Sequence, residues 1–94
     1  MLRHNAYFDG AVQSLGFERN GLEATVGVID SGEFRFNTGV AERMTVVSGM
    51  VAAKLPGRDW HLYPAGTYFE VPASSAFDVR SEGGPAAYLC EFLG

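Results

Sequence analysis

Apolar and polar residues alternate along much of this chain with the period of β-strands. The clearest case is the segment GEFRFNT, residues 32–38, where Phe34 and Phe36 alternate with charged and amide side chains. Successive side chains of a strand point to opposite faces, so the pattern is typical of a strand with one buried face. We expect the two phenylalanines to face the core and Arg35, between them, to lie on the surface.

Other segments rich in β-branched or aromatic residues lie between turn signals in the same way. The predicted strand segments are residues 22–30, 32–38, 42–57 with a break at Ser48-Gly49, 59–66, 67–72, and two short strands around Gly83-Gly84-Pro85. Asp30-Ser31-Gly32 predicts a hairpin that joins the first two segments. The stretch VAERMTVV resembles a helix in its spacing, but its Thr-Val-Val run and the glycine that follows favour a strand.

Roughly eight to ten short strands at turn spacing predict an all-β sandwich or barrel. The chain has 94 residues, which we expect to form a single domain over residues 1–94. Such a chain is near the lower end of what buries a self-sufficient core, so an interface with a second copy would help it.

Composition limits the partners. The formal net charge is -4, and the seven basic residues form no run, so a nucleic-acid partner is not expected. No apolar run approaches ~18 residues, so no membrane span is expected either. Cys90 is the one cysteine and has no intrachain partner, which suits a reducing compartment and predicts a cytoplasmic protein.

The stretch AERMTVVSG, residues 41–49, resembles half of the metal-binding motif of the cupin superfamily. The residues that match this half-motif are Glu42, Val46, Val47 and Gly49. The two upstream positions at which cupins place His are Phe36 and Thr38, and the His of the second cupin motif falls at Phe69. The resemblance implies a cupin-type β-barrel, also called a double-stranded β-helix or jelly roll, that has lost its metal ligands and needs no cofactor.

A longer resemblance covers residues 6–93. The combinations EFRF, ERMTVVSG, VPASSAF and YLC, in this order, closely resemble the small bacterial pyrimidine/purine nucleoside phosphorylase family of one-domain cupins. The resemblance implies a homodimer that cleaves many purine and pyrimidine ribonucleosides. Inorganic phosphate would be the co-substrate, and ribose 1-phosphate and the free base would be the products.

Glu42 is the first candidate for a catalytic residue. If the strand parity of the cupin motif holds, its carboxylate points into the barrel. There it would accept hydrogen bonds from ribose hydroxyls and stabilise a sugar that gains cationic character. The alternative is a structural role at a loop edge, paired with Arg43 or Arg35.

Phosphate, ribose and base each need further contacts. The candidate substrate-binding residues are Phe36, Thr38, Met44, Arg58, Tyr68, Ser75 and Phe77. Arginine suits phosphate, hydroxyls suit ribose or phosphate, and aromatic or methionine side chains suit bases of differing size. Plainer alternatives stay open for several of them. Arg58 is either a mobile loop charge or a phosphate clamp contributed across a dimer, Ser75 is otherwise a turn former, and the aromatics are otherwise core.

Two other functions remain open from the sequence. The same pocket would serve a non-catalytic nucleoside-binding cupin. A metal-dependent cupin enzyme would have to assemble its ligands from His4, His61, Glu42 and Cys90, which lack any H-x-H spacing. His61 is also a candidate general acid toward the departing base.

Overall fold

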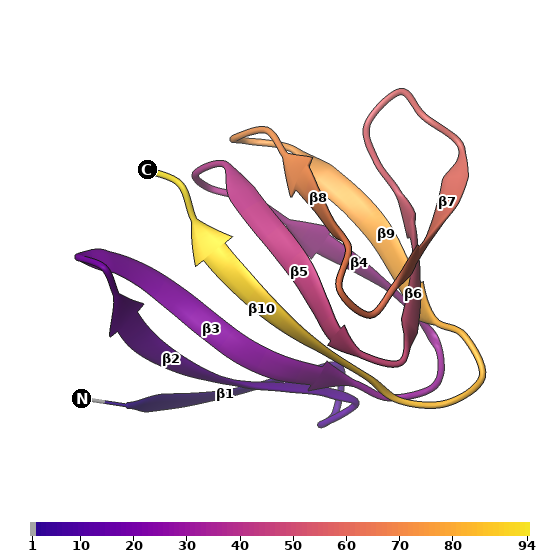
Figure 1. Cartoon of the computed structure of the whole chain (residues 1–94), viewed down its shortest axis with the longest axis horizontal. Helices are drawn as coiled ribbons and strands as arrows, with labels where there is room; N and C mark the ends of the chain where they lie inside the picture. Colours follow the sequence, from indigo (N-terminus) through magenta and orange to yellow (C-terminus); the bar gives the residue numbers. More distant parts are fainter. Residues whose placement is uncertain (1) are drawn as a thin grey trace.

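A computed structural model describes residues 2–94, which form ten strands and no helix (Figure 1). The strands are β1 (Arg3–Tyr7), β2 (Val12–Arg19), β3 (Leu22–Ile29), β4 (Glu33–Asn37), β5 (Glu42–Ser48), β6 (Met50–Lys54), β7 (Trp60–Pro64), β8 (Tyr68–Val71), β9 (Ala76–Ser81) and β10 (Ala86–Phe92). The all-β prediction is confirmed, and VAERMTVV contributes to a strand. No helix among these residues could span a membrane.

The strands form two antiparallel sheets that face each other. One has the order β1-β2-β3-β10-β5-β8 and the other the order β4-β9-β6-β7. In Figure 1 the first sheet takes up the left of the view and β6 and β7 lie on the right. This is the arrangement expected of a cupin-type fold, although the strands do not close into a complete barrel.

The hairpin predicted at Asp30-Ser31-Gly32 is wrong. β3 pairs with β2 and β10 in the six-stranded sheet, whereas β4 pairs with β9 in the other sheet. The turn therefore carries the chain from one sheet to the other. Ile29 before it and Phe34 after it pack into the same core from opposite sides. The alternation of apolar residues indicates which face of a strand is buried, but it does not indicate which strand is its partner.

The N-terminal segment, to which the sequence assigned no strand, contains the hairpin of β1 and β2. Val12, Ser14 and Gly16 form the buried face of β2. Two of these residues are small and not strongly apolar, so the usual alternation signal is weak.

The core lies between the sheets. Its fully buried larger side chains come from both sheets and are Phe77, Ile29, Val12, Val46, Val51, Val71 and Val79. On the six-stranded sheet Tyr88 of β10 lies directly opposite Gly27 of β3. A Cβ at position 27 would lie 2.5 Å from Cζ and Oη of Tyr88, so only glycine leaves room for the phenol ring there.

The outer face of the six-stranded sheet carries several exposed apolar side chains. Strand register places five side chains in one line across it, here called the apolar row: Leu15, Val26, Leu89, Thr45 and Tyr68. Three of these, Leu15, Val26 and Tyr68, are 46%, 47% and 57% exposed. Val28 and Val47, outside the row, are exposed as well.

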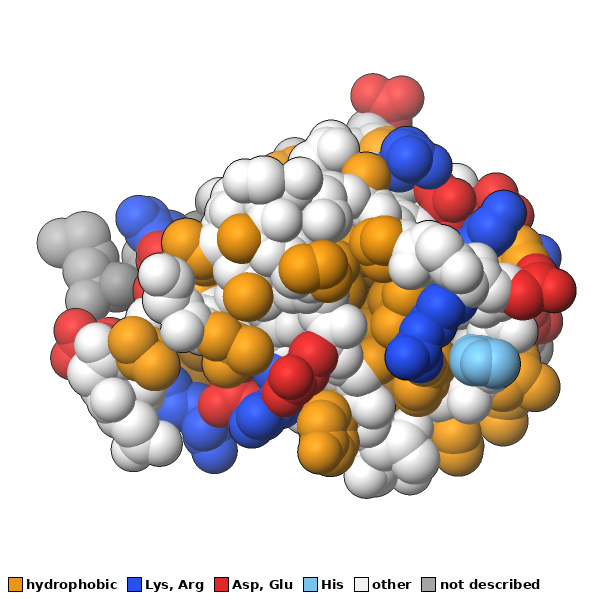
Figure 2. All heavy atoms as spheres, turned by 90° about the horizontal axis from the view of Figure 1, so that it is seen from above, with side chains coloured by type: hydrophobic (Ala, Val, Ile, Leu, Met, Phe, Trp, Pro, Cys, Tyr) orange, Lys and Arg blue, Asp and Glu red, His pale blue; other side chains and the backbone are white. Residues whose placement is uncertain are grey.

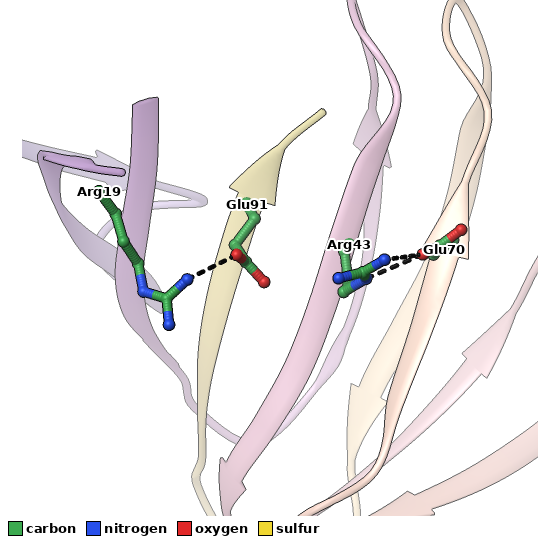
Figure 3. A network of polar contacts seen from close by, with 4 residues as sticks. All are labelled: Arg19, Arg43, Glu70 and Glu91. Atoms are coloured by element: carbon green, nitrogen blue, oxygen red, sulfur yellow. Dashed lines mark hydrogen bonds and ion pairs between the residues drawn. The ribbon is translucent and has the colours of Figure 1, made fainter. Parts of the chain in front are cut away.

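Beside the apolar row runs a line of charges, here called the charged row. Arg19 Nη1 donates to Glu91 at 2.8 Å, and Arg43 donates to Glu70 through Nε and Nη2 at 2.8 and 2.6 Å (Figure 3). The signs alternate across the sheet. The face shown in Figure 2 likewise mixes acidic and basic side chains, with apolar ones between them.

Candidate functional site

A cavity of about 380 Å³, here called the inter-sheet pocket, opens between the two sheets. β5 and β10 form one wall with Glu42, Met44, Tyr88, Cys90 and Phe92, and β4 forms the opposite wall with Arg35, Phe36 and Asn37. The rest of the lining comes from Val12, Ser14 and Thr25 and from the β1–β2 hairpin with Tyr7 and Phe8. Its volume and mostly apolar lining with few polar groups fit a site for a small organic ligand.

Glu42 is the acidic residue of this lining. It begins β5 on the inward-facing side of the strand and is 8% exposed. Burial raises the pKa of its carboxyl group, and a hydrogen bond from Cys90 partly opposes that shift. The thiol of Cys90 donates to Oε1 at 3.4 Å, and its own pKa is raised by burial and then by Glu42, so it remains a thiol at neutral pH.

Glu42 has no cationic partner among residues 2–94. The arginines considered as partners pair elsewhere: Arg43 with Glu70, and Arg35 with Asp78 at 3.1 Å. The carboxylate can therefore accept further hydrogen bonds from a ligand.

Tyr88 supplies a second polar group to the pocket. It is 5% exposed, and burial raises the pKa of its phenol, while a hydrogen bond with Ser14 acts in the opposite direction. The phenol is neutral at physiological pH and is able both to donate and to accept.

Arg35 brings a cation to the mouth of the pocket. Its side chain is 65% exposed, as the alternation with Phe34 and Phe36 predicted, yet it also belongs to the pocket lining. β4 is an edge strand of its sheet. A long side chain on its outer face can reach around that edge, which strand parity alone does not reveal.

The structure brings three of the eight predicted site residues together in this pocket. They are Glu42, Phe36 and Met44. Phe77 lies behind Phe36 in the core, 1% exposed, with its ring edge-on to Phe36 at a centroid distance of 5.5 Å.

Thr38 and Ser75 bind each other instead of lining the pocket. The Thr38 hydroxyl donates to the Pro72 carbonyl at 2.7 Å and accepts from the Ser75 amide at 2.9 Å. The Ser75 hydroxyl donates to the carbonyl of Ala73 at 3.2 Å. These contacts tie the end of β4 to the β8–β9 turn, so the Thr38 hydroxyl has no spare proton for substrate.

Arg58 and Tyr68 line a different hollow of about 430 Å³, together with Leu55, Pro56, Tyr63, Phe69, Glu70 and Pro72. It shares no lining residue with the inter-sheet pocket. The geometry therefore does not support a contact between Arg58 or Tyr68 and a substrate in the inter-sheet pocket of the same chain. A contact made from a second subunit stays a prediction.

Several lining residues were not among the predicted site residues. They are Tyr7, Phe8, Val12, Ser14, Thr25, Arg35, Asn37, Tyr88, Cys90 and Phe92. Those of β2 and β3 reach the pocket because β2, in the N-terminal hairpin, pairs with β3. That hairpin carried no clear signal in the sequence. Asn37 and Arg35 share β4 with Phe36, so proximity to a predicted residue was the one available hint.

Comparison with known proteins now adds to this geometry. The sequence matches the family described as pyrimidine/purine nucleoside phosphorylase over residues 2–92. The chain belongs to this family. Relatives bearing the same name include one from Anaeromyxobacter sp. (strain Fw109-5), 63% identical over 99% of this chain and 89% of its own. Another, from Sorangium cellulosum (strain So ce56), is 61% identical over 99% and 100%.

A solved structure supports the fold of this family member. A protein of unknown function from Vibrio parahaemolyticus superposes with a TM-score of 0.94 at 42% identity, covering 99% of both chains. The family match and the named relatives confirm, at the level of the family, the resemblance noted from EFRF, ERMTVVSG and VPASSAF.

In this member of the pyrimidine/purine nucleoside phosphorylase family, the residues weighed as metal ligands lie apart. His4 on β1 contacts Gln13 at 3.1 Å, and His61 is exposed on β7 of the other sheet. Within residues 2–94 no three His, Cys, Asp or Glu side chains gather as a metal site requires. Glu42 and Cys90 do meet, but only as a pair.

Proposed function

We propose that this protein cleaves purine and pyrimidine ribonucleosides with inorganic phosphate. A phosphate oxygen forms a bond to C1′ as the bond from C1′ to the base nitrogen breaks, and the base leaves with the bonding electrons. The proton of hydrogen phosphate ends on the base, so the products are ribose 1-phosphate and the neutral free base. The observation that carries this proposal is a buried Glu42, without a cationic partner among residues 2–94, in a nucleoside-sized, aromatic pocket.

Glu42 would act on the sugar. As the bond to the base lengthens, the ribose gains oxocarbenium character, and a fixed carboxylate in a site of low dielectric stabilises that charge. The same oxygens would accept hydrogen bonds from ribose hydroxyls. The Cys90 thiol holds the carboxylate in one orientation, which lowers the reorganisation needed in the transition state.

Arg35 is our choice for the phosphate contact. Its guanidinium lies at the pocket mouth and, among residues 2–94, pairs with Asp78 alone, a partly exposed pair of the kind that contributes little stability. Phosphate could bind that guanidinium through a bidentate contact while Asp78 remains nearby. Arg58 would contribute only from a second subunit.

We propose broad base specificity and a reaction without a metal ion. Phe36 and Met44 offer the base apolar and π surfaces, which accept purines and pyrimidines alike. The positions where cupins hold metal carry Phe36, Thr38 and Phe69. Positioning and electrostatics can supply much of the catalysis in reactions of this type.

We also propose that the chain is a cytoplasmic homodimer. The apolar row exposes Leu15, Val26 and Tyr68 in one line, an apolar surface of the kind that marks interaction sites, and a two-fold axis would place it against itself. The charged row alternates in sign, so two copies need not repel one another there. The free, buried Cys90 suits a reducing compartment.

The decisive experiment measures release of free base from uridine, inosine and guanosine by chelator-treated protein, with and without phosphate. Release that depends on phosphate and survives chelation is the expected result. Binding of nucleosides by a folded protein without any release would instead favour the non-catalytic nucleoside-binding cupin. Release that chelation abolishes would favour a metal-dependent enzyme.

A further inference from the structure

The aromatic residues at the mouth of the inter-sheet pocket have a geometry suited to a flat ligand. The rings of Phe8 and Phe36 are nearly parallel, at 11°, with their centroids 6.1 Å apart. Both residues line the pocket. Two flat faces turned toward one another are the arrangement in which a nucleobase stacks, since each base offers a π face whatever groups lie on its edge.

The two rings differ in how firmly they are held. Phe36 is on β4 and rests edge-on against the buried ring of Phe77 at 5.5 Å, and Phe77 in turn contacts Phe69 at 6.0 Å. Phe36 therefore has a packed core behind it. Phe8 is 46% exposed and touches Phe34 at a centroid distance of 4.9 Å.

Phe8 belongs to a turn and not to a strand. Residues 8–11 join β1 to β2, and Phe8 and Asp9 both have left-handed backbones, with φ of 54° and 55°. The turn is closed by hydrogen bonds from the Gly10 amide to Tyr7 and from the Ala11 amide to Phe8, both at 3.1 Å. Such a turn positions a side chain over the pocket while leaving it free to shift outward.

The spacing indicates which ring must move. A base stacked between two rings needs about 3.5 Å on each side, or about 7 Å in total. The planes of Phe8 and Phe36 can be no farther apart than their centroids, which are 6.1 Å apart. Admitting a base therefore requires an opening of at least about 1 Å, and the exposed Phe8 can provide it more easily than the core-backed Phe36.

We propose that Phe8 and Phe36 form a stacking slot for the nucleobase, in which Phe8 is the movable face that closes on the ligand. This inference rests on the proposed phosphorylase function and names the group that holds the base. Stacking reads no donor or acceptor on the base edge. The slot would thus accept both purines and pyrimidines and leave the ribose toward Glu42.

The test compares Phe8→Ala, Phe8→Leu and Phe8→Trp with the unaltered protein. Binding of inosine and of uridine is measured by titration calorimetry without phosphate, and KM is measured in its presence. Loss of one stacking face should raise the Kd for both nucleosides by about 5-fold to about 150-fold. Phe8→Trp should bind at least as tightly as the unaltered protein, and the affinity for inorganic phosphate should stay the same.

Two controls keep packing and stacking apart. Leucine at position 8 preserves apolar contact with Phe34 but has no flat face, so Phe8→Leu should lose affinity nearly as Phe8→Ala does. Leu62→Ala removes an apolar side chain that is also exposed, at 61%, from β7 of the other sheet and should change nothing. Thermal unfolding of each variant establishes that it is folded.

The outcomes separate this slot from the reaction. Unchanged nucleoside affinity in Phe8→Ala, full affinity in Phe8→Leu, or no nucleoside binding by the unaltered protein would each overturn the slot. Phosphorolysis with an unaffected KM in Phe8→Ala would leave the proposed reaction standing and refute the slot. Binding that depends on Phe8 without base release would do the reverse.

Discussion

At the scale of single residues, the buried charge of Glu42 lowers the stability of the fold, whereas the proposed reaction requires that charge. Burial raises its pKa, so the folded protein binds this proton more tightly than the unfolded chain does. The native state therefore loses stability as the pH rises from the ordinary pKa of glutamate to the raised pKa of Glu42. Above the raised pKa, the full free-energy cost of the buried charge is present.

Glu42→Gln should remove this cost and the activity together. We expect thermal unfolding at pH 8 at the same temperature as the unaltered protein or higher, with the advantage shrinking toward pH 4. Base release should fall by about 100-fold or more, because the sugar cation loses its counter-charge. Unfolding curves across this pH range and kcat measurements check both parts. Lower stability of the variant at every pH would point to a structural role.

The sequence identified Glu42 through the cupin half-motif, because a strand motif carries information about which face a side chain occupies. It could not identify Arg35 as a pocket residue, since that depends on β4 being an edge strand. Nor could it show that Thr38 lies outside the pocket, because only the structure shows that the Thr38 hydroxyl is already bonded.

At the scale of elements, one hydroxyl connects the end of β4 to the turn between β8 and β9. Thr38→Val should leave the Ser75 amide and the Pro72 carbonyl without this partner, at a cost of about 1–3 kcal/mol. For a domain of this size the melting temperature should fall by about 4–8 °C per kcal/mol. Calorimetry measures that fall, and Thr38→Ser should show little of it. A higher KM with an unchanged melting temperature would instead indicate a direct substrate contact.

Strand positions were largely predictable because β-branched runs, period-2 alternation and Gly or Pro turns are local properties of the sequence. Strand partners were not. β3 and β4 are separated by a turn that looks like a hairpin, yet they pair in different sheets. Pairing is decided by which buried faces fit together across the whole domain, and that information is not local.

At the scale of the whole molecule, the apolar row should be where two copies meet. Val26→Lys would place like charges near each other across a two-fold axis, which costs several kcal/mol. We expect the dimer dissociation constant to rise by about 100-fold or more. Light scattering coupled to gel filtration measures it, with Leu62→Lys on the other sheet as the control. A monomeric unaltered protein, or a Val26→Lys dimer as tight as the original, would count against this interface.

The fit between Gly27 and Tyr88 predicts that these two positions, distant in the sequence, change together in evolution. Because a Cβ at position 27 would meet the phenol ring at 2.5 Å, a larger residue there is compatible with this backbone only if position 88 becomes smaller at the same time. Each single change passes through a strained intermediate, since overfilling a packed site costs about 1–3 kcal/mol. The pair should therefore be inherited together, and lineages that alter one should be found to have altered the other.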